Sequence, residues 1–128
     1  KYVLIGHSMG GYIALEIANL VPNNIKGLCL MNSTALPDTE EKKINRDRAI
    51  VAVKQNHKTF VRIAIPMLFS EENRTIYTSD IKEITNEALK ISPQGIIAAL
   101  EGMKIRIDQT SIYKKATFSI SASMIVTV

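Results

Sequence analysis

The sequence predicts an α/β fold built on a parallel sheet, and three observations lead to this prediction. An apolar run at residues 2–5 is followed by a glycine-rich turn and then by apolar residues at helical spacing. A second apolar run at residues 28–31 completes a predicted strand at residues 25–31, and the pattern from residue 35 to residue 108 is helical. Near-continuous apolar strands are typical of parallel sheets covered on both faces. The two strands and the helix between them therefore predict a βαβ unit.

The first turn carries a recognisable motif. Residues 6–10 read Gly-His-Ser-Met-Gly, a G-x-S-x-G pattern between a strand and a helix. This order is typical of a nucleophile elbow, a tight turn that holds its central residue, Ser8, strained at the tip of the sheet. Gly6 and Gly10 are expected where a Cβ would clash with the crossing chain. The following helix directs its free N–H groups toward the position of an oxyanion.

Three other kinds of glycine-rich turn share this strand-to-helix position. A dinucleotide fingerprint needs G-x-G-x-x-G and a later acidic residue, but Ser8 replaces the second glycine and the next strand ends at Asn32. A P-loop needs Gly-Lys-Ser/Thr, but Tyr12 follows Gly11. A glycine-rich turn without chemistry is the remaining alternative to the elbow.

The helix after the turn is predicted to end at Pro22, because Pro-Asn-Asn stops a helix. One apolar stripe at helical spacing is expected to be its buried face. The stripe consists of Ile13, Ile17, Leu20 and Val21.

Residues 40–61 are predicted to form a long helix, because the acidic residues Asp38, Glu40 and Glu41 suit a helix N-terminus. Its apolar stripe consists of Ile50, Val53, His57, Phe60 and Val61. Pro66 interrupts the continuation, so a short turn or broken helix is expected there. Asp80 with Glu83 is expected to start another helix as a capping box. Ser92 is expected to cap a further helix that has proline at its first position.

The last residues, 118–128, alternate between apolar and small polar side chains. A period of two is typical of a strand with one exposed face. The sequence therefore predicts a final strand in this stretch.

Composition excludes several classes of protein. The chain has 128 residues, a net charge of +4 and 46% hydrophobic residues, which suits one globular unit. No apolar run is long enough to cross a membrane, and no secretory signal pattern precedes the first strand. The lone Cys29 is expected as a buried thiol and suits a reducing compartment, the cytoplasm. Cys29, His7 and His57 do not have metal-ligand spacing, so no metal or cofactor is expected. Nor is nucleic-acid binding expected, because no aromatic residues are interleaved with the basic ones.

The elbow residues 6–11, with the helix and the strand at residues 25–31, resemble the middle of an α/β-hydrolase. The resemblance is to the serine branch with a helical cap, which includes esterases, lactonases and cofactor-free haloperoxidases. It implies a hydrolase core at residues 1–35, a helical cap at 36–108, and a linker with a returning core strand at 109–128. It also implies that the chain is a central fragment of the fold.

The resemblance assigns roles to the elbow residues. Ser8 is the expected nucleophile and the Met9 amide is an oxyanion donor, while Gly6, His7, Gly10 and Gly11 shape the elbow. Serine at the nucleophile position excludes the dehalogenase branch, which uses aspartate there.

The catalytic acid and base are not identified in this chain. Asp38, the first acidic residue after the second strand, is a candidate substitute for the acid, because some members of the resembled family place the acid there. Asn32 cannot ionise, so it is at best a neutral hydrogen-bonding substitute. His57 is interpreted as a partly buried histidine of the cap.

The expected function is that of a serine hydrolase acting on a small-molecule ester, lactone or other acyl substrate, incomplete in these 128 residues. Two alternatives remain. The chain is an inactive or degenerate hydrolase relative with a binding or structural role, or it belongs to a C–C bond hydrolase or haloperoxidase-like enzyme of the same fold.

Overall fold

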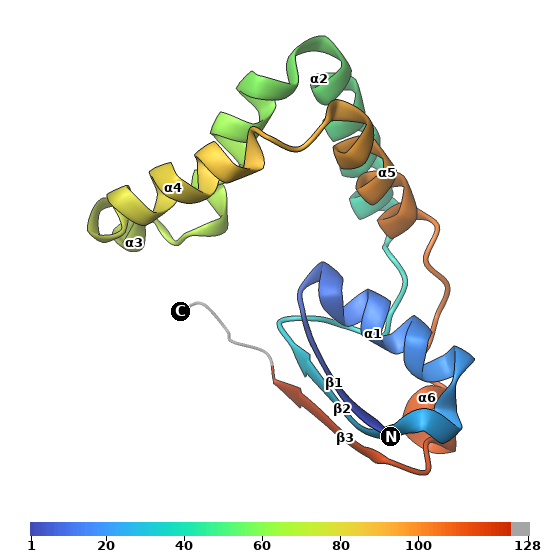
Figure 1. Cartoon of the computed structure of the whole chain (residues 1–128). Coiled ribbons are helices and arrows are strands. Elements are labelled where there is room, and N and C mark those ends of the chain that lie inside the picture. The colour runs from blue at the N-terminus through green and yellow to red at the C-terminus, as the bar shows by residue number, and fades with distance from the viewer. Residues whose placement is uncertain (124–128) are drawn as a thin grey trace. The chain divides into compact units, whose positions relative to one another are not determined.

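The computed structural model describes residues 1–123, which fall into two compact units (Figure 1). Residues 1–38 and 105–123 form the first, which we call the core unit. Thr39–Lys104 form the second, the helical unit. No helix in the described part of the chain combines the length and the apolar character that a membrane crossing requires.

The core unit contains a three-stranded sheet in the order β1-β2-β3. Its elements are β1 (Tyr2–His7), α1 (Met9–Leu20), η1 (Pro22–Asn24), β2 (Ile25–Met31), α6 (Ile112–Lys115) and β3 (Ser119–Ser123). Both strand pairs are parallel, with Leu4 opposite Leu28 and Leu28 opposite Ile120. The α/β class, the two parallel strands and the helix between them are confirmed.

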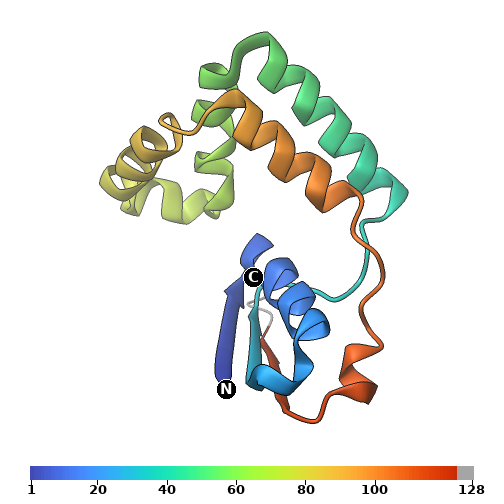
Figure 2. The same ribbon diagram turned by 45° about the vertical axis from the view of Figure 1, so that its right-hand side comes forward.

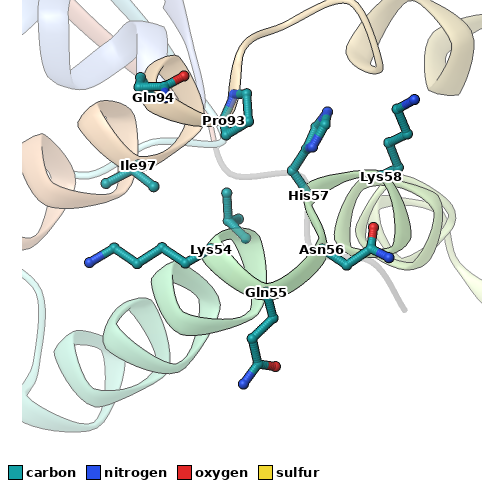
Figure 3. Close-up of a pocket in the computed structure, with 9 residues that line it drawn as sticks. Lys54, Gln55, Asn56, His57, Lys58, Pro93, Gln94 and Ile97 are labelled. Carbon is teal, nitrogen blue, oxygen red and sulfur yellow. The ribbon is translucent and has the colours of Figure 1, made fainter.

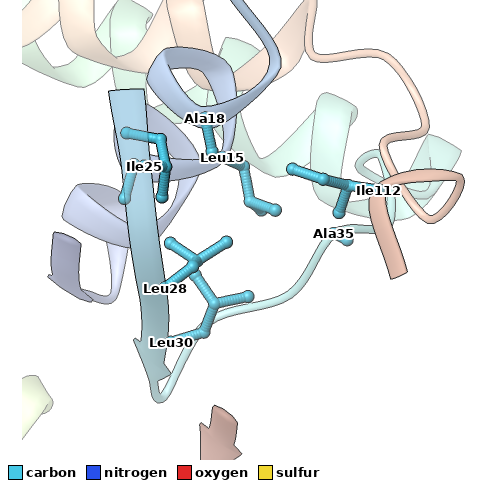
Figure 4. Close-up of a cluster of buried hydrophobic side chains, with 8 residues drawn as sticks. Leu15, Ala18, Ile25, Leu28, Leu30, Ala35 and Ile112 are labelled. Atoms are coloured by element: carbon cyan, nitrogen blue, oxygen red, sulfur yellow. The ribbon is translucent and has the colours of Figure 1, made fainter. Parts of the chain in front are cut away.

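Side chains from α1, β2 and α6 point toward one another to form the core (Figure 4). Leu15, Leu28 and Leu30 are at most 2% exposed. Burial of a leucine side chain is worth about 1.5–3 kcal/mol, so this cluster fixes α1 on the sheet.

The predicted buried stripe of α1 is wrong. The helix buries Gly11, Ala14, Leu15 and Ala18, whereas Ile13 and Leu20 are 54% and 70% exposed. Leu15 and the β2 leucines already fill the space between helix and sheet, so the other residues of this face are small. The spacing of apolar residues pointed to the larger side chains, which lie on the opposite face of α1.

β3 confirms the returning strand as far as Ser123, and the predicted continuation through residues 124–128 lies outside the described residues. Ile120 is half-buried against the core, whereas Ser119 and Ser121 are exposed, as the alternation predicts. Helix α6, which the sequence pattern does not predict, inserts the buried side chain of Ile112 into the core.

The helical unit consists of helices, and its two longest, α2 and α5, lie side by side (Figure 2). Its elements are α2 (Glu40–Ala64), η2 (Pro66–Leu68), α3 (Glu71–Ile76), α4 (Thr78–Ala88) and α5 (Pro93–Lys104). The predicted stripe of α2 is confirmed, with Ile50, Val53 and Val61 buried. Asn56 interrupts α2 with a non-helical φ of −158° and ψ of 90°, and its Oδ1 accepts a hydrogen bond from the Thr59 N–H at 3.0 Å. Asn56 therefore starts the second part of α2 as an N-cap does.

One predicted helix start is confirmed and another is wrong. Ser92 Oγ accepts a hydrogen bond from the Gly95 N–H at 3.1 Å, as expected of the cap of α5. Asp80, by contrast, lies inside the first turn of α4, which begins at Thr78. The Thr78 hydroxyl lies 3.1 Å from the Arg74 carbonyl and 2.9 Å from that of Thr75. The chain thus passes directly from α3 into α4, which leaves no place for a capping box at Asp80.

Candidate active site

Ser8 lies at the tight turn between β1 and α1, in a strained backbone conformation. Its φ is 51° and its ψ is −120°. Among the described non-glycine residues only Ser8 and Asn32 have a positive φ. Such a conformation costs an L-residue on the order of 1–3 kcal/mol. Strain of this kind at an exposed serine is what the elbow interpretation predicts.

Two backbone hydrogen bonds hold the turn. The Ser8 N–H donates to the Met31 carbonyl at 2.9 Å, which continues the parallel pairing of His7 with Met31. The Gly11 N–H donates to the Ser8 carbonyl at 3.0 Å and begins α1. The Ser8 hydroxyl makes no capping hydrogen bond, although serine at this position commonly makes one. The side chain of Ser8 is exposed, so its oxygen is accessible to a reactant.

The glycines of the elbow have different roles. A Cβ on Gly6 would lie 2.5 Å from the Gly10 carbonyl oxygen and 2.5 Å from the Gly11 Cα. A Cβ on Gly11 would overlap the side chain of Ser33. A Cβ on Gly10 would meet nothing within 4 Å, so the expected clash at Gly10 is wrong. The backbone that crosses close to Gly6 at this turn belongs to Gly10 and Gly11.

Met9 is the first residue of α1, and no acidic residue occupies the first turn of that helix. The first N–H groups of a helix have no carbonyl partner within it and carry the positive end of the helix dipole. The amide that follows Ser8 is therefore suited to receive negative charge.

His7 is directed to the end of the second strand. Its Nε2 lies 3.5 Å from Nδ2 of Asn32, the residue that follows β2. In residues 1–123, the Ser8 hydroxyl makes no hydrogen bond to a histidine or a carboxylate. Of the expected catalytic groups, the described structure brings together the Ser8 hydroxyl and the Met9 amide.

Asp38 is the buried partner of an arginine. Its side chain is 1% exposed and its Oδ1 lies 2.8 Å from Nη2 of Arg106. The carboxylate is therefore engaged in an ion pair, which does not support the sequence hypothesis of Asp38 as a substitute catalytic acid.

His57 belongs to the helical unit, where it lines a hollow of about 540 Å³ (Figure 3). The hollow lies at the interruption of α2 and the start of α5. Its lining residues are Val53, Lys54, Gln55, Asn56, His57, Lys58, Pro93, Gln94 and Ile97. No cluster of three or more potential metal ligands occurs within the described ranges.

Sequence reasoning missed two features near the elbow. Ser33 is 9% exposed, and its hydroxyl is buried without a hydrogen-bond partner against Gly11. Arg106 lies with its guanidinium carbon 3.5 Å from the ring centroid of Tyr12 in α1. Both contacts join residues far apart in the chain, and no local sequence pattern indicates them.

The pKa values of Asp108 and Lys104 are shifted by neighbouring hydrogen bonds. The hydroxyl and the N–H of Thr110 donate to Asp108 and lower the pKa of its carboxyl below the ordinary value. Hydrogen bonds to Asp47 and Glu101 raise the pKa of Lys104 above its ordinary value. Neither group is a candidate for catalysis.

The chain is similar to proteins of known fold. The family model of the alpha/beta hydrolase fold matches residues 1–77. Among solved structures, the chain is similar to a thermophilic esterase from Thermogutta terrifontis, studied with malate bound, with 32% sequence identity and a TM-score of 0.84. The match covers 97% of this chain and 46% of the esterase, so the chain spans about half the length of that protein. No curated protein sequence matches the chain.

Proposed function

Because the chain belongs to the α/β-hydrolase fold family, we propose that the intact protein is a serine hydrolase that cleaves a small-molecule ester or lactone, with Ser8 as its nucleophile. The observation that carries the proposal is the exposed Ser8 with its strained backbone between β1 and α1. The similarity to an esterase supports the same class of reaction.

The chemistry follows from the positions of the two groups. The Ser8 oxygen attacks the carbonyl carbon of the substrate while a general base takes the hydroxyl proton. Negative charge develops on the carbonyl oxygen, where the Met9 N–H donates a hydrogen bond. The intermediate collapses to an acyl-serine, and the alcohol leaves with the proton that the base returns. Water then attacks the acyl-serine by the same route and releases the acid.

The remaining elbow residues serve this geometry. Gly6 and Gly11 allow the close crossing of the chain at the turn, and His7 contacts the end of β2 through Asn32. No role in proton transfer is assigned to His7 or to Asp38. The base, the orienting acid and the second oxyanion donor are not assigned to residues of this chain.

The helical unit is proposed to act as the cap of the enzyme. It is compact, consists of helices, and follows β2 and precedes β3 in the chain. In this proposal the core unit supplies the reacting serine, and the helical unit supplies part of the surface that selects the substrate.

The proposal is tested by labelling the intact protein with a serine-directed fluorophosphonate probe. We expect one adduct, located at Ser8 by peptide mass spectrometry, and none in the Ser8→Ala variant. Failure of the folded wild-type protein to react at Ser8 contradicts the proposal and favours an inactive relative with a binding role.

A second assay separates the reaction classes. Hydrolysis of p-nitrophenyl esters and of lactones by the intact protein supports the esterase assignment. Cleavage of carbon–carbon bonds in β-diketones without ester turnover favours the C–C hydrolase alternative. We expect no turnover by the isolated 128-residue chain, because no general base is assigned to its residues. General-base catalysis accelerates such a reaction by about 10²–10⁴-fold.

A further inference from the structure

Arg106 lies at the centre of a group of contacts in the core unit, just after the chain returns from the helical unit. Its Nη2 pairs with Asp38 Oδ1 at 2.8 Å, and its Nη1 donates to the Leu36 carbonyl at 3.0 Å. Its guanidinium carbon lies 3.5 Å from the ring centroid of Tyr12. The side chains of Arg106 and Asp38 are only 14% and 1% exposed. One side chain therefore connects the outgoing segment, the returning segment and α1.

A second set of contacts runs parallel to the first. The Gln109 N–H donates to the Ala35 carbonyl at 2.9 Å. The Gln109 side-chain amide donates to Glu16, which lies one helical turn after Tyr12. Three contacts thus join the returning segment to the outgoing one, and two join the returning segment to α1. We call the contacts of Arg106 with Asp38, Leu36 and Tyr12 the Arg106 clasp.

The chemistry of the Arg106 clasp requires arginine. The planar guanidinium stacks on an aromatic ring while its N–H groups reach a carboxylate and a carbonyl, which the point charge of a lysine does not reproduce. The buried Asp38 carboxylate in turn depends on a cation, because an unpaired buried charge is strongly unfavourable.

Tyr12 connects the clasp to the elbow. It lies in the first turn of α1, four residues after Ser8 and one residue after Gly11, whose N–H bonds the Ser8 carbonyl. A displacement of Tyr12 therefore moves the turn that begins with the Met9 amide.

We propose that Arg106, which lies on the returning segment, is a positioning residue. It holds the first turn of α1 in place, and with it the Met9 amide, the oxyanion donor that follows Ser8. The expected effect of Arg106 on the reactivity of Ser8 rests on the proposed function. Its expected effect on the first turn of α1 does not. The proposal assigns a role in positioning the elbow to a residue 98 positions later in the chain.

The test uses Arg106→Lys, Tyr12→Leu and Tyr12→Phe in the intact protein. We expect Arg106→Lys and Tyr12→Leu to increase hydrogen exchange in a peptide spanning residues 8–13 more than in peptides from β2. We also expect them to slow fluorophosphonate labelling of Ser8 on the order of 10- to 100-fold, with the protein fully folded. Tyr12→Phe keeps the stacked ring, so both measurements should match the wild type.

Asp47→Asn is the matched control, because it removes an ion pair of 2.6 Å with Lys104 inside the helical unit. It should change neither measurement. Unchanged exchange at residues 8–13, or an equal rise throughout the core unit, overturns the positioning role. If the wild-type protein is not labelled at all, the proposed function fails, and the exchange measurement still decides whether Arg106 holds the first turn of α1.

Discussion

Ser8 combines an unfavourable backbone conformation with an exposed hydroxyl, and the two properties respond differently to substitution. Its φ of 51° is accessible to glycine at little cost but strained for any residue with a Cβ. We expect Ser8→Gly to be more stable than Ser8→Ala by about 1 kcal/mol in urea denaturation, with labelling abolished in both variants. Equal midpoints for the two variants would show that the surrounding structure does not enforce the strain.

The elbow glycines offer a matched pair. Gly6→Ala places a Cβ 2.5 Å from backbone atoms that have no freedom to rotate away. We expect it to cost about 2 kcal/mol or more in unfolding free energy, as overpacking does, and to reduce labelling at Ser8. Gly10→Ala enters open space and should change stability by less than about 1 kcal/mol. A Gly10 variant as damaged as the Gly6 variant would contradict the described geometry of the turn.

Asp108 supplies a prediction on pH. Hydrogen bonds from Thr110 lower the pKa of its carboxyl in the folded state, so its contribution to stability is present above the ordinary pKa and disappears as the pH falls through the folded value. Thr110→Val removes the hydroxyl donor and should bring the pKa of Asp108 back toward 3.8, as measured by carboxyl NMR titration. A wild-type value at or above 3.8 would exclude the depression.

At the scale of elements, the sequence pattern predicted those strands and helices whose formation depends on residues close together in the chain. β1, β2, α2 and the capped start of α5 follow from apolar runs, helical spacing and one serine before a proline. The buried face of α1 did not follow, because neighbouring strands decide which side of a helix is covered. The short helices α3 and α6 were missed because they hold too few residues for a periodic pattern.

The candidate site divides in the same way. Ser8, Met9 and Gly6 are adjacent in the chain, and the motif predicts them together. The contact of Ser33 with Gly11 and the clasp of Arg106 depend on how the end of β2 and the returning segment meet α1. Such contacts are set by tertiary packing. A single sequence does not show how its strands and helices pack against one another.

The cap of α5 gives a prediction at this scale. Ser92→Ala removes the acceptor for the Gly95 N–H and should cost about 1 kcal/mol, measured as a lower urea midpoint. Ser79→Ala serves as the control, since the Ser79 hydroxyl is exposed and contacts only the neighbouring Asp80 at 3.4 Å. Equal losses in the two variants would contradict the capping role of Ser92.

At the scale of the whole molecule, the chain leaves the core unit after Asp38 and returns at Ile105. The pairing of Arg106 with Asp38 keeps these two points close within the core unit itself. A short Gly-Ser linker in place of residues 39–104 should therefore preserve the fold of the core unit in the intact protein.

We expect this deletion variant to retain labelling at Ser8 and to lose discrimination among acyl chain lengths, as measured by kcat/KM for a series of esters. Retained discrimination would contradict the proposed role of the helical unit. A variant that does not fold, judged by circular dichroism, would contradict the independence of the core unit.

The position of β1 has one more consequence. It is the outer strand of the described sheet, and Tyr2, Val3 and Ile5 are 62–69% exposed along it. An edge strand with unpaired backbone N–H and C=O groups and exposed apolar side chains can pair with a strand of another chain. The isolated polypeptide should accordingly form thioflavin-positive aggregates, and the substitution Val3→Lys should delay their onset.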